Sequence, residues 1–88
     1  MSNKPNVVMY TAAGCGYCSA AKNLLNKKGV EYIEIRIDKE AGMREEMIQR
    51  SHRYTVPQIF IGDVHVGGFD DLADLEMDDE LDPLLGLV

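Results

Sequence analysis

Residues 6–18 read NVVMYTAAGCGYC, and this stretch decides the fold. The apolar run at 6–10 is typical of a buried strand, and the small residues at 11–14 predict a turn. From Cys15 to about residue 28 apolar side chains recur at helical spacing, with Lys27 and Lys28 in the last turn and Gly29 as a stop. A strand, a turn and a helix that begins at a cysteine are therefore expected.

The rest of the chain predicts further strands and helices. In order, they are a strand over 33–37, a helix over 41–50, strands over 56–61 and 64–66 joined by a Gly62-Asp63 turn, a helix over 69–75 and a last helical turn over 82–85 that covers a sheet edge. Ile33, Ile35 and Ile37 alternate with charged residues, which predicts a half-exposed strand with the isoleucines on one side.

The element order β-α-β-α-β-β-α predicts an α/β fold. A helix between the first two strands implies that they are parallel, with a right-handed crossover. The Gly62-Asp63 turn implies an antiparallel hairpin, so the sheet should be mixed, with helices on both faces. At this length we expect a single domain spanning residues 1–88.

Composition and charge exclude several classes of protein. The chain has 88 residues, 45% hydrophobic and 27% charged, which is too apolar for a disordered chain. Two cysteines are too few for the disulfide framework of a small secreted scaffold. No run approaches the ~18–20 apolar residues of a membrane span, and residues 1–6 lack the core of a signal peptide. We therefore expect a cytoplasmic protein that does not bind membranes.

The charge is unevenly distributed along the chain. Residues 1–53 carry all nine Lys and Arg against six acids, whereas residues 54–88 carry nine acids and no Lys or Arg, for a net charge of −6. Phosphate affinity comes from clustered cations, so this balance argues against nucleic-acid binding. We interpret the acidic end as a solvated face, with a docking surface for a basic partner as the alternative.

The motif Cys15-Gly16-Tyr17-Cys18 carries the chemistry. Unpaired N–H groups and the positive end of the helix dipole stabilise an anion at a helix start, so the pKa of the Cys15 thiol should fall from ~8.5 into the ~3.5–7.5 range of such sites. Cys18 lies one turn deeper on the same side, close enough to form a disulfide. This predicts an exposed attacking thiol at Cys15 and a shielded resolving thiol at Cys18.

Two other roles for the cysteine pair have to be weighed. A structural disulfide here would stabilise little, because a four-residue loop hardly constrains the unfolded chain. A zinc site would need two more ligands, and the spacing of His52 and His65 matches no zinc-finger pattern. We therefore favour a redox role and expect no metal ligands.

Further motifs flank the cysteines at specific spacings. Tyr10-Thr11 precedes them, and Thr55-Val56-Pro57 and then Gly67-Gly68 with Asp70-Asp71 follow. From about residue 7 to 85 this order resembles glutaredoxins, most closely small bacterial dithiol glutaredoxins of the glutaredoxin 3 type. The resemblance implies a thioredoxin fold, with a four-stranded mixed sheet flanked by helices.

The resemblance also implies a glutathione-binding site. A cis bond between Val56 and Pro57 would turn the Val56 N–H and C=O toward Cys15, where the cysteinyl unit of glutathione pairs with them. Asp70 would pair with the γ-glutamyl ammonium while N–H groups hold the carboxylate, although Asp70 could instead only cap its helix. Tyr17 would form one wall of the groove or only pack. The implied glutathione-binding residues are Tyr17, Thr55, Val56, Pro57, Gly68, Phe69 and Asp70.

The sequence departs from the family at two positions. Many members carry a Lys at the place of Ala12, where it pairs with the glycyl carboxylate of glutathione; Arg44 is the first choice of substitute here and Arg53 the second. Losing that pair should weaken binding by about 1 kcal/mol. Gly16 stands where Pro is commonest, and relatives with Gly or Ser there sometimes bridge a [2Fe–2S] cluster between two subunits.

The function that follows is glutathione-dependent thiol–disulfide oxidoreduction. In a monothiol route Cys15 takes glutathione from a protein mixed disulfide, and in a dithiol route Cys18 resolves a mixed disulfide with a protein. We expect glutathione and glutathionylated or disulfide-bonded proteins as partners of a monomer. A cluster-binding dimer is the alternative. A thioredoxin is disfavoured, because thioredoxins usually carry Trp beside the cysteines and this chain has none.

Overall fold

The apolar run before the cysteines becomes the inner strand β1 of the sheet. The computed structural model describes residues 4–88; residues 1–3, half of the segment searched for a signal peptide, lie outside the described residues. The elements are β1 (Val7–Thr11), α1 (Gly16–Lys27), β2 (Ile33–Arg36), α2 (Met43–Ser51), β3 (Gln58–Ile61), β4 (Val64–Gly67), α3 (Phe69–Met77) and α4 (Leu81–Leu84). This is the predicted order, and the last helical turn expected over 82–85 forms as α4.

The four strands form one mixed sheet in the order β2-β1-β3-β4. β1 and β2 run parallel across the α1 crossover, whereas β3 is antiparallel to both β1 and β4. Gly62 adopts a positive φ of 58° in the two-residue turn between β3 and β4, as the Gly62-Asp63 pair predicted. The mixed topology expected from the sequence is confirmed.

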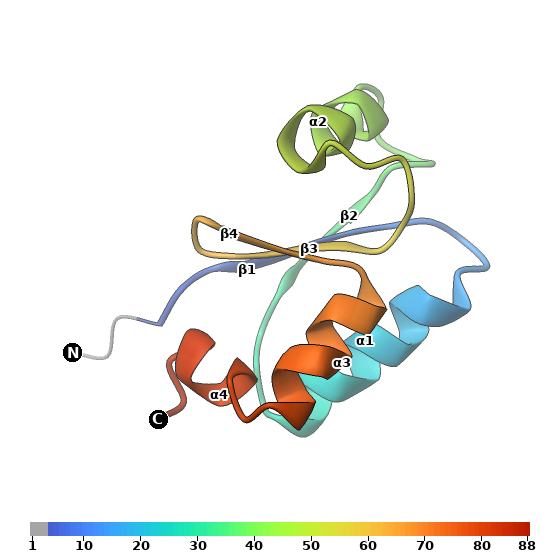
Figure 1. Cartoon of the computed structure of the whole chain (residues 1–88). Helices are drawn as coiled ribbons and strands as arrows, with labels where there is room; N and C mark the ends of the chain where they lie inside the picture. The colour runs from blue at the N-terminus through green and yellow to red at the C-terminus, as the bar shows by residue number, and fades with distance from the viewer. Residues whose placement is uncertain (1–3) are drawn as a thin grey trace.

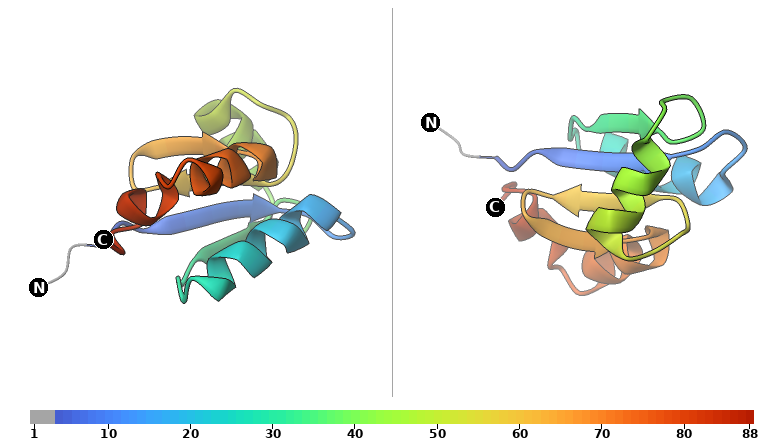
Figure 2. Two further views of the ribbon diagram at one scale, coloured as in Figure 1. Left: turned by 60° about the horizontal axis from the view of Figure 1, so that its bottom comes forward. Right: turned by 90° about the horizontal axis from the view of Figure 1, so that it is seen from above.

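Helices cover both faces of the sheet (Figure 1). α2 crosses one face, and α1, α3 and α4 lie on the other, as Figure 2 shows from two further directions. β1 serves both layers through its period of two: Val7 and Met9 are buried toward α1 and α3, and Tyr10 is buried with Met47 of α2. This burial on both faces explains why residues 6–10 are almost continuously apolar.

Three local predictions need correction. The three isoleucines at 33–37 do not share the same burial. β2 is an edge strand, and α2 covers only the carboxyl end of this strand, near Ile37, so Ile33 at the other end is 56% exposed. α2 begins at Met43 rather than 41, since Gly42 holds a φ of 82° and ends any helix on its N-terminal side. α4 packs Leu81 and Leu85 into the core on the α1 and α3 face and does not cover a sheet edge.

The topology brings three loops together at one end of the strands. The pairs Tyr10↔Gln58 and Ile59↔Gly67 place the end of β1, the start of β3 and the end of β4 side by side. The three segments at this end of the sheet are the cysteine loop, the Thr55–Pro57 loop and the Gly68 turn into α3. The three motifs that are distant in sequence therefore meet in space.

Within the part of the chain that the structure describes, no helix is long and apolar enough to cross a membrane.

Candidate active site

Cys15 occupies the N-cap of α1, outside the first helical turn. Its backbone is extended, with φ −96° and ψ 105°, and its Sγ accepts a hydrogen bond from the Cys18 N–H at 3.1 Å. This is one of the N–H groups that a helix leaves unpaired at its start. The arrangement favours negative charge on the Cys15 sulfur.

The two cysteines are joined in a disulfide, with their Cα atoms 5.2 Å apart. Cys15 is half-buried, whereas Cys18 is 2% exposed and lies against the body of the protein. The sulfur that a second molecule can reach is therefore Cys15, as the order of the motif predicted. No group of three or more His, Cys, Asp or Glu residues within 4–88 is arranged to hold a metal ion.

The Thr55–Pro57 loop approaches Cys15 from the start of β3. The Val56-Pro57 peptide bond is cis, as the family resemblance implied, and the Val56 carbonyl oxygen lies 3.7 Å from Cys15 Sγ. Within residues 4–88 neither the N–H nor the C=O of Val56 makes a backbone hydrogen bond. An extended strand could therefore pair with this residue beside the reactive sulfur.

A groove of about 340 Å³ runs along this loop to the start of α3. Tyr17 and Phe69 stack at one side of it, with ring centroids 6.3 Å apart. All seven residues implied as glutathione contacts line this groove, together with two more, Arg53 and Asp71. Four segments of the chain contribute to this one concave surface.

The turn into α3 shows which glycine the groove requires. Gly67 has a φ of 116°, and a Cβ there would collide with the Asp71 carboxylate and lie 2.9 Å from an Arg53 nitrogen. A Cβ at Gly68 would meet only the Pro57 carbonyl oxygen, at an ordinary 3.6 Å. The tight approach therefore belongs to Gly67, whereas Gly68 supplies the N-cap of α3.

Asp71, rather than Asp70, caps α3. Its Oδ2 accepts the Gly68 N–H at 3.0 Å and an Arg53 N–H at 2.9 Å, and these two donors hold the pKa of the Asp71 carboxyl below its usual value. Asp70 lies in the first turn of α3, exposed and facing the groove. The capping alternative for Asp70 is wrong, and within residues 4–88 its carboxylate makes no hydrogen bond or ion pair, which leaves it open to a ligand.

Of the two arginines considered as substitutes for the missing lysine, Arg53 is the one at the groove. It lines the groove and spends one of its five N–H donors on Asp71. Arg44 is exposed on α2 and does not line the groove. Arg53 is therefore the cation at the α3 end of this groove, and the preference for Arg44 as the substitute stays a prediction.

A second hollow of about 390 Å³ lies on the other side of the cysteines and includes Ala12. Lys22 of α1 pairs with Glu34 of β2 at 2.6 Å, and the Thr11 hydroxyl donates to the same carboxylate at 2.6 Å. These two contacts lower the pKa of Glu34. Ala12 therefore faces a region that already holds a paired cation.

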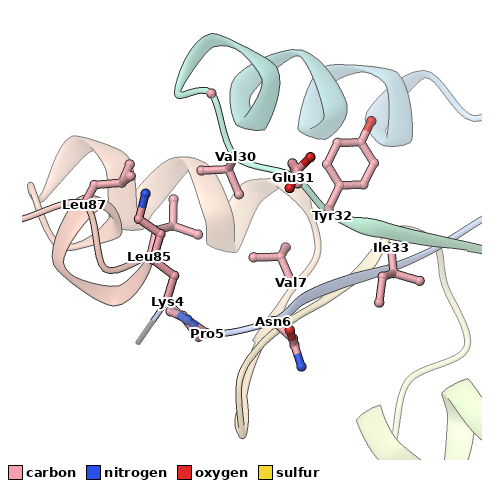
Figure 3. A pocket seen from close by; sticks show the side chains of 11 residues that line it. Lys4, Pro5, Asn6, Val7, Val30, Glu31, Tyr32, Ile33, Leu85 and Leu87 are labelled. Carbon is pink, nitrogen blue, oxygen red and sulfur yellow. The ribbon is translucent and has the colours of Figure 1, made fainter. Parts of the chain in front are cut away.

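A larger cavity of about 590 Å³ lies at the opposite end of the strands, near the start of β1. It lies between the first described residues, the loop before β2 and the C-terminal segment (Figure 3). Figure 3 shows Val7, Val30 and Leu85 at its inner side, with the Tyr32 hydroxyl turned away from them. It contains neither cysteine, so the redox chemistry is not there.

Sequence analysis missed two polar residues behind the loop, Gln58 and His65. Gln58 is completely buried and bonded to both Thr55 and His65. The available signal was a glutamine within the otherwise apolar run of β3, because a fully buried amide requires partners.

Comparison with known proteins decides the family. The sequence model of the glutaredoxin family matches residues 7–66. The chain belongs to the glutaredoxin family. It is 56% identical over 80 residues to "Glutaredoxin 3" of Escherichia coli K12, covering 91% of this chain and 96% of that protein. A glutaredoxin of Pseudomonas aeruginosa is 51% identical over 81 residues, covering 92% and 96%.

Solved structures agree with this assignment. A Brucella melitensis glutaredoxin is 51% identical, with a TM-score of 0.83 over 96% of this chain and 91% of that one. A buckwheat glutaredoxin–glutathione complex is 33% identical, with a TM-score of 0.85 over 96% and 78%. The thioredoxin fold is thereby confirmed. This glutaredoxin is a glutathione-dependent thiol–disulfide oxidoreductase, and the comparisons do not favour the cluster-binding alternative.

Proposed function

We propose that this glutaredoxin binds glutathione in the groove beside Cys15 and there reduces protein–glutathione mixed disulfides and protein disulfides. One observation carries the proposal: the seven residues that the family resemblance implies as glutathione contacts all line one groove. One of them, Val56, lies beside Cys15. The structure of the buckwheat glutaredoxin in complex with glutathione supports the proposal.

Glutathione would lie in the groove in an extended conformation. Its cysteinyl unit pairs with the Val56 N–H and C=O, which lack backbone partners in the described chain, and its sulfur then faces Cys15. The γ-glutamyl carboxylate lies at the start of α3, where N–H groups are unpaired, and its ammonium meets Asp70. Arg53, bonded to Asp71 at this same end of the groove, adds positive charge beside the γ-glutamyl carboxylate, and Arg44 remains the expected partner of the glycyl carboxylate.

In the monothiol route the Cys15 thiolate attacks the glutathione sulfur of a mixed disulfide. A bond forms between Cys15 and glutathione, and the protein leaves as a thiolate. A second glutathione thiolate then attacks the glutathione sulfur bound to Cys15, which releases oxidised glutathione and restores the Cys15 thiolate. Cys18 takes no part, and its burial keeps it from competing for the substrate.

In the dithiol route Cys15 attacks a protein disulfide and forms a mixed disulfide with that protein. Cys18 then attacks Cys15 Sγ, which releases the second protein thiol and leaves the Cys15–Cys18 disulfide, the form in the structure. Two glutathione molecules reduce this disulfide and leave as oxidised glutathione. We propose the cytosol as the place of action, because its pool of reduced glutathione drives both routes.

Serine variants of the two cysteines test this assignment. Cys15→Ser should abolish glutathione-coupled reduction of a glutathionylated peptide, because no nucleophile remains at the groove. Cys18→Ser should retain this activity and lose only the reduction of protein disulfides. Steady-state assays with reduced glutathione and glutathione reductase measure both. Equal loss in the two variants would contradict the roles, and an inactive wild type would contradict the function.

A further inference from the structure

Gln58 is a polar residue at a position where the strand offers it no water. Its side chain is 0% exposed at the start of β3, yet each polar end has a partner. Nε2 lies 3.1 Å from the Thr55 carbonyl oxygen and 3.4 Å from the Thr55 hydroxyl, and Oε1 lies 2.7 Å from His65 Nε2. A buried amide with this many contacts fixes the groups around it.

The direction of these hydrogen bonds follows from the chemistry of the partners. A carbonyl oxygen only accepts, so the Gln58 amide nitrogen has to face Thr55 and its oxygen has to face His65. That oxygen also only accepts, so His65 Nε2 carries the proton. The chain of donation therefore runs from His65 through Gln58 to the Thr55 carbonyl, and it holds for both the neutral Nε2–H tautomer and the imidazolium.

The Thr55 carbonyl belongs to the same peptide unit as the Val56 N–H. This unit is trans, since the cis bond of the loop follows Val56, and a trans peptide directs its C=O and N–H to opposite sides. When Gln58 draws the Thr55 oxygen inward, the Val56 N–H is turned outward to the groove. Within residues 4–88 that N–H has no backbone acceptor.

We propose that Gln58 and His65 are positioning residues that aim the Val56 N–H at the backbone of bound glutathione. The inference rests on the proposed glutathione site and adds residues that do not themselves line the groove. His65 is itself held in place: its ring stacks on Phe60 at 4.8 Å, and the Arg50 guanidinium of α2 lies 4.1 Å from that Phe60 ring. Neither residue contacts Cys15, so they set the substrate's position rather than the reactivity of the thiol.

Two variants remove this chain of hydrogen bonds at different points. Gln58→Met keeps the length of the side chain and removes both bonds, and His65→Phe keeps a ring on Phe60 and removes only the donor to Gln58. Val64→Thr, at a 46% exposed position of the same strand as His65, is the matched control. Without Gln58, the peptide unit between Thr55 and Val56 is free to rotate, and the hydrogen bond from the Val56 N–H to glutathione is weakened. Losing about one hydrogen bond corresponds to roughly a fivefold loss of affinity for glutathione.

Three measurements on each protein separate positioning from other effects. The first is kcat and KM for a glutathionylated peptide, and the second is the rate of Cys15 alkylation by iodoacetamide. The third is the shift of the Val56 amide resonance when Cys15 carries glutathione in a Cys18→Ser background. We expect Gln58→Met to raise KM roughly fivefold, His65→Phe to raise it about twofold, and both to reduce the Val56 shift. Alkylation rates and the control should match the wild type.

The outcomes distinguish this inference from the function on which it rests. An unchanged KM and an unchanged Val56 shift in Gln58→Met would overturn the positioning role while leaving the glutathione site intact. A parallel fall in alkylation rate would overturn it too, because the effect would then act on the thiol. A wild-type Val56 resonance that does not respond to glutathione at Cys15 would instead refute the proposed binding mode. Should Gln58→Met fail to fold, the same criteria apply to the milder His65→Phe.

Discussion

At the residue scale, Cys15 and Cys18 have the same side chain and different surroundings. Cys15 caps α1 with a half-buried sulfur that accepts the Cys18 N–H, whereas Cys18 is inside the helix and 2% exposed. Cys15 lies outside the first turn, whereas Cys18 lies one turn deeper on the face of α1 that Ala21 and Leu25 also bury. The position of the motif at the start of an amphipathic helix therefore predicted which sulfur is accessible and which is buried.

The positions of Arg53 and Arg44 relative to the groove could not be derived from the sequence in the same way. Each is a cation outside the motifs, and choosing between them required the path of the loop between α2 and β3. The structure puts Arg53 in the groove, 2.9 Å from Asp71, and Arg44 outside it. Pairwise distances across a fold are set by tertiary packing, which no local spacing encodes.

A pair of neutral substitutions tests the choice. Arg53→Gln should raise the KM for a glutathionylated peptide about fivefold, the effect of losing a partly solvated ion pair worth about 1 kcal/mol. Arg44→Gln removes the same charge from α2 and should raise the KM by a similar factor, because the pair with the glycyl carboxylate is lost. Both are measured in the glutathione-coupled assay at low and moderate salt. An unchanged KM in Arg44→Gln would contradict the preference drawn from the sequence.

At the element scale, the regular segments with strong patterns were predictable and their ends were not. β1, α1 and the β3–β4 hairpin follow from apolar periodicity and a glycine turn, whereas the start of α2 depended on the left-handed backbone of Gly42. The exposure of Ile33 could not be predicted for a similar reason. The isoleucines of β2 alternate regularly with charged residues, but tertiary packing decides which part of this edge strand α2 covers.

The start of α1 leads to a stability prediction. Gly16 is the first helical residue, a Cβ there meets nothing within 4 Å, and the Cys15 backbone is already in the extended region that proline requires of its predecessor. Gly16→Pro should therefore raise the free energy of unfolding by about 0.5–1 kcal/mol, since it restricts the unfolded chain without straining the folded one. Urea unfolding of the reduced protein measures it.

A matched substitution serves as the control for that effect. Gly14, two residues earlier, holds a φ of 70°, which proline cannot adopt, so Gly14→Pro should destabilise the protein. A loss of stability in Gly16→Pro would show that the N–H of residue 16 or the freedom of the turn contributes to the fold.

At the scale of the whole molecule, the uneven charge of the sequence acquires a structural role. Lys28 of α1 pairs with Glu76 at 2.8 Å and with Asp82 at 2.6 Å, and Arg53 pairs with Asp71. Cations of the first half thus contact acids of the second at the two ends of α3 and in α4. Asp82 and Glu76 raise the pKa of the Lys28 ammonium, as expected for a half-buried cation between carboxylates.

The distribution of apolar surface predicts the oligomeric state. The large hydrophobic residues more than a third exposed among residues 4–88 belong to separate elements and loops: Tyr17, Ile33, Tyr54, Val64, Met77 and Val88. A stable dimer needs a contiguous interface of about 1,000 Å² or more, which scattered side chains do not provide. Light scattering after size-exclusion chromatography should therefore give one species of 9.8 kDa, with or without glutathione.

The same experiment addresses the remaining alternative for Gly16. Anaerobic incubation with iron, sulfide and glutathione should leave the protein colourless and monomeric, because the exposed large apolar side chains of residues 4–88 are scattered and offer a second subunit no contiguous interface. A brown species of twice the mass would restore the cluster-binding dimer, and Gly16→Pro should then suppress the colour by stiffening the turn between the cysteines. A colourless dimer would contradict the monomer prediction alone, so mass and absorbance test different parts of the argument.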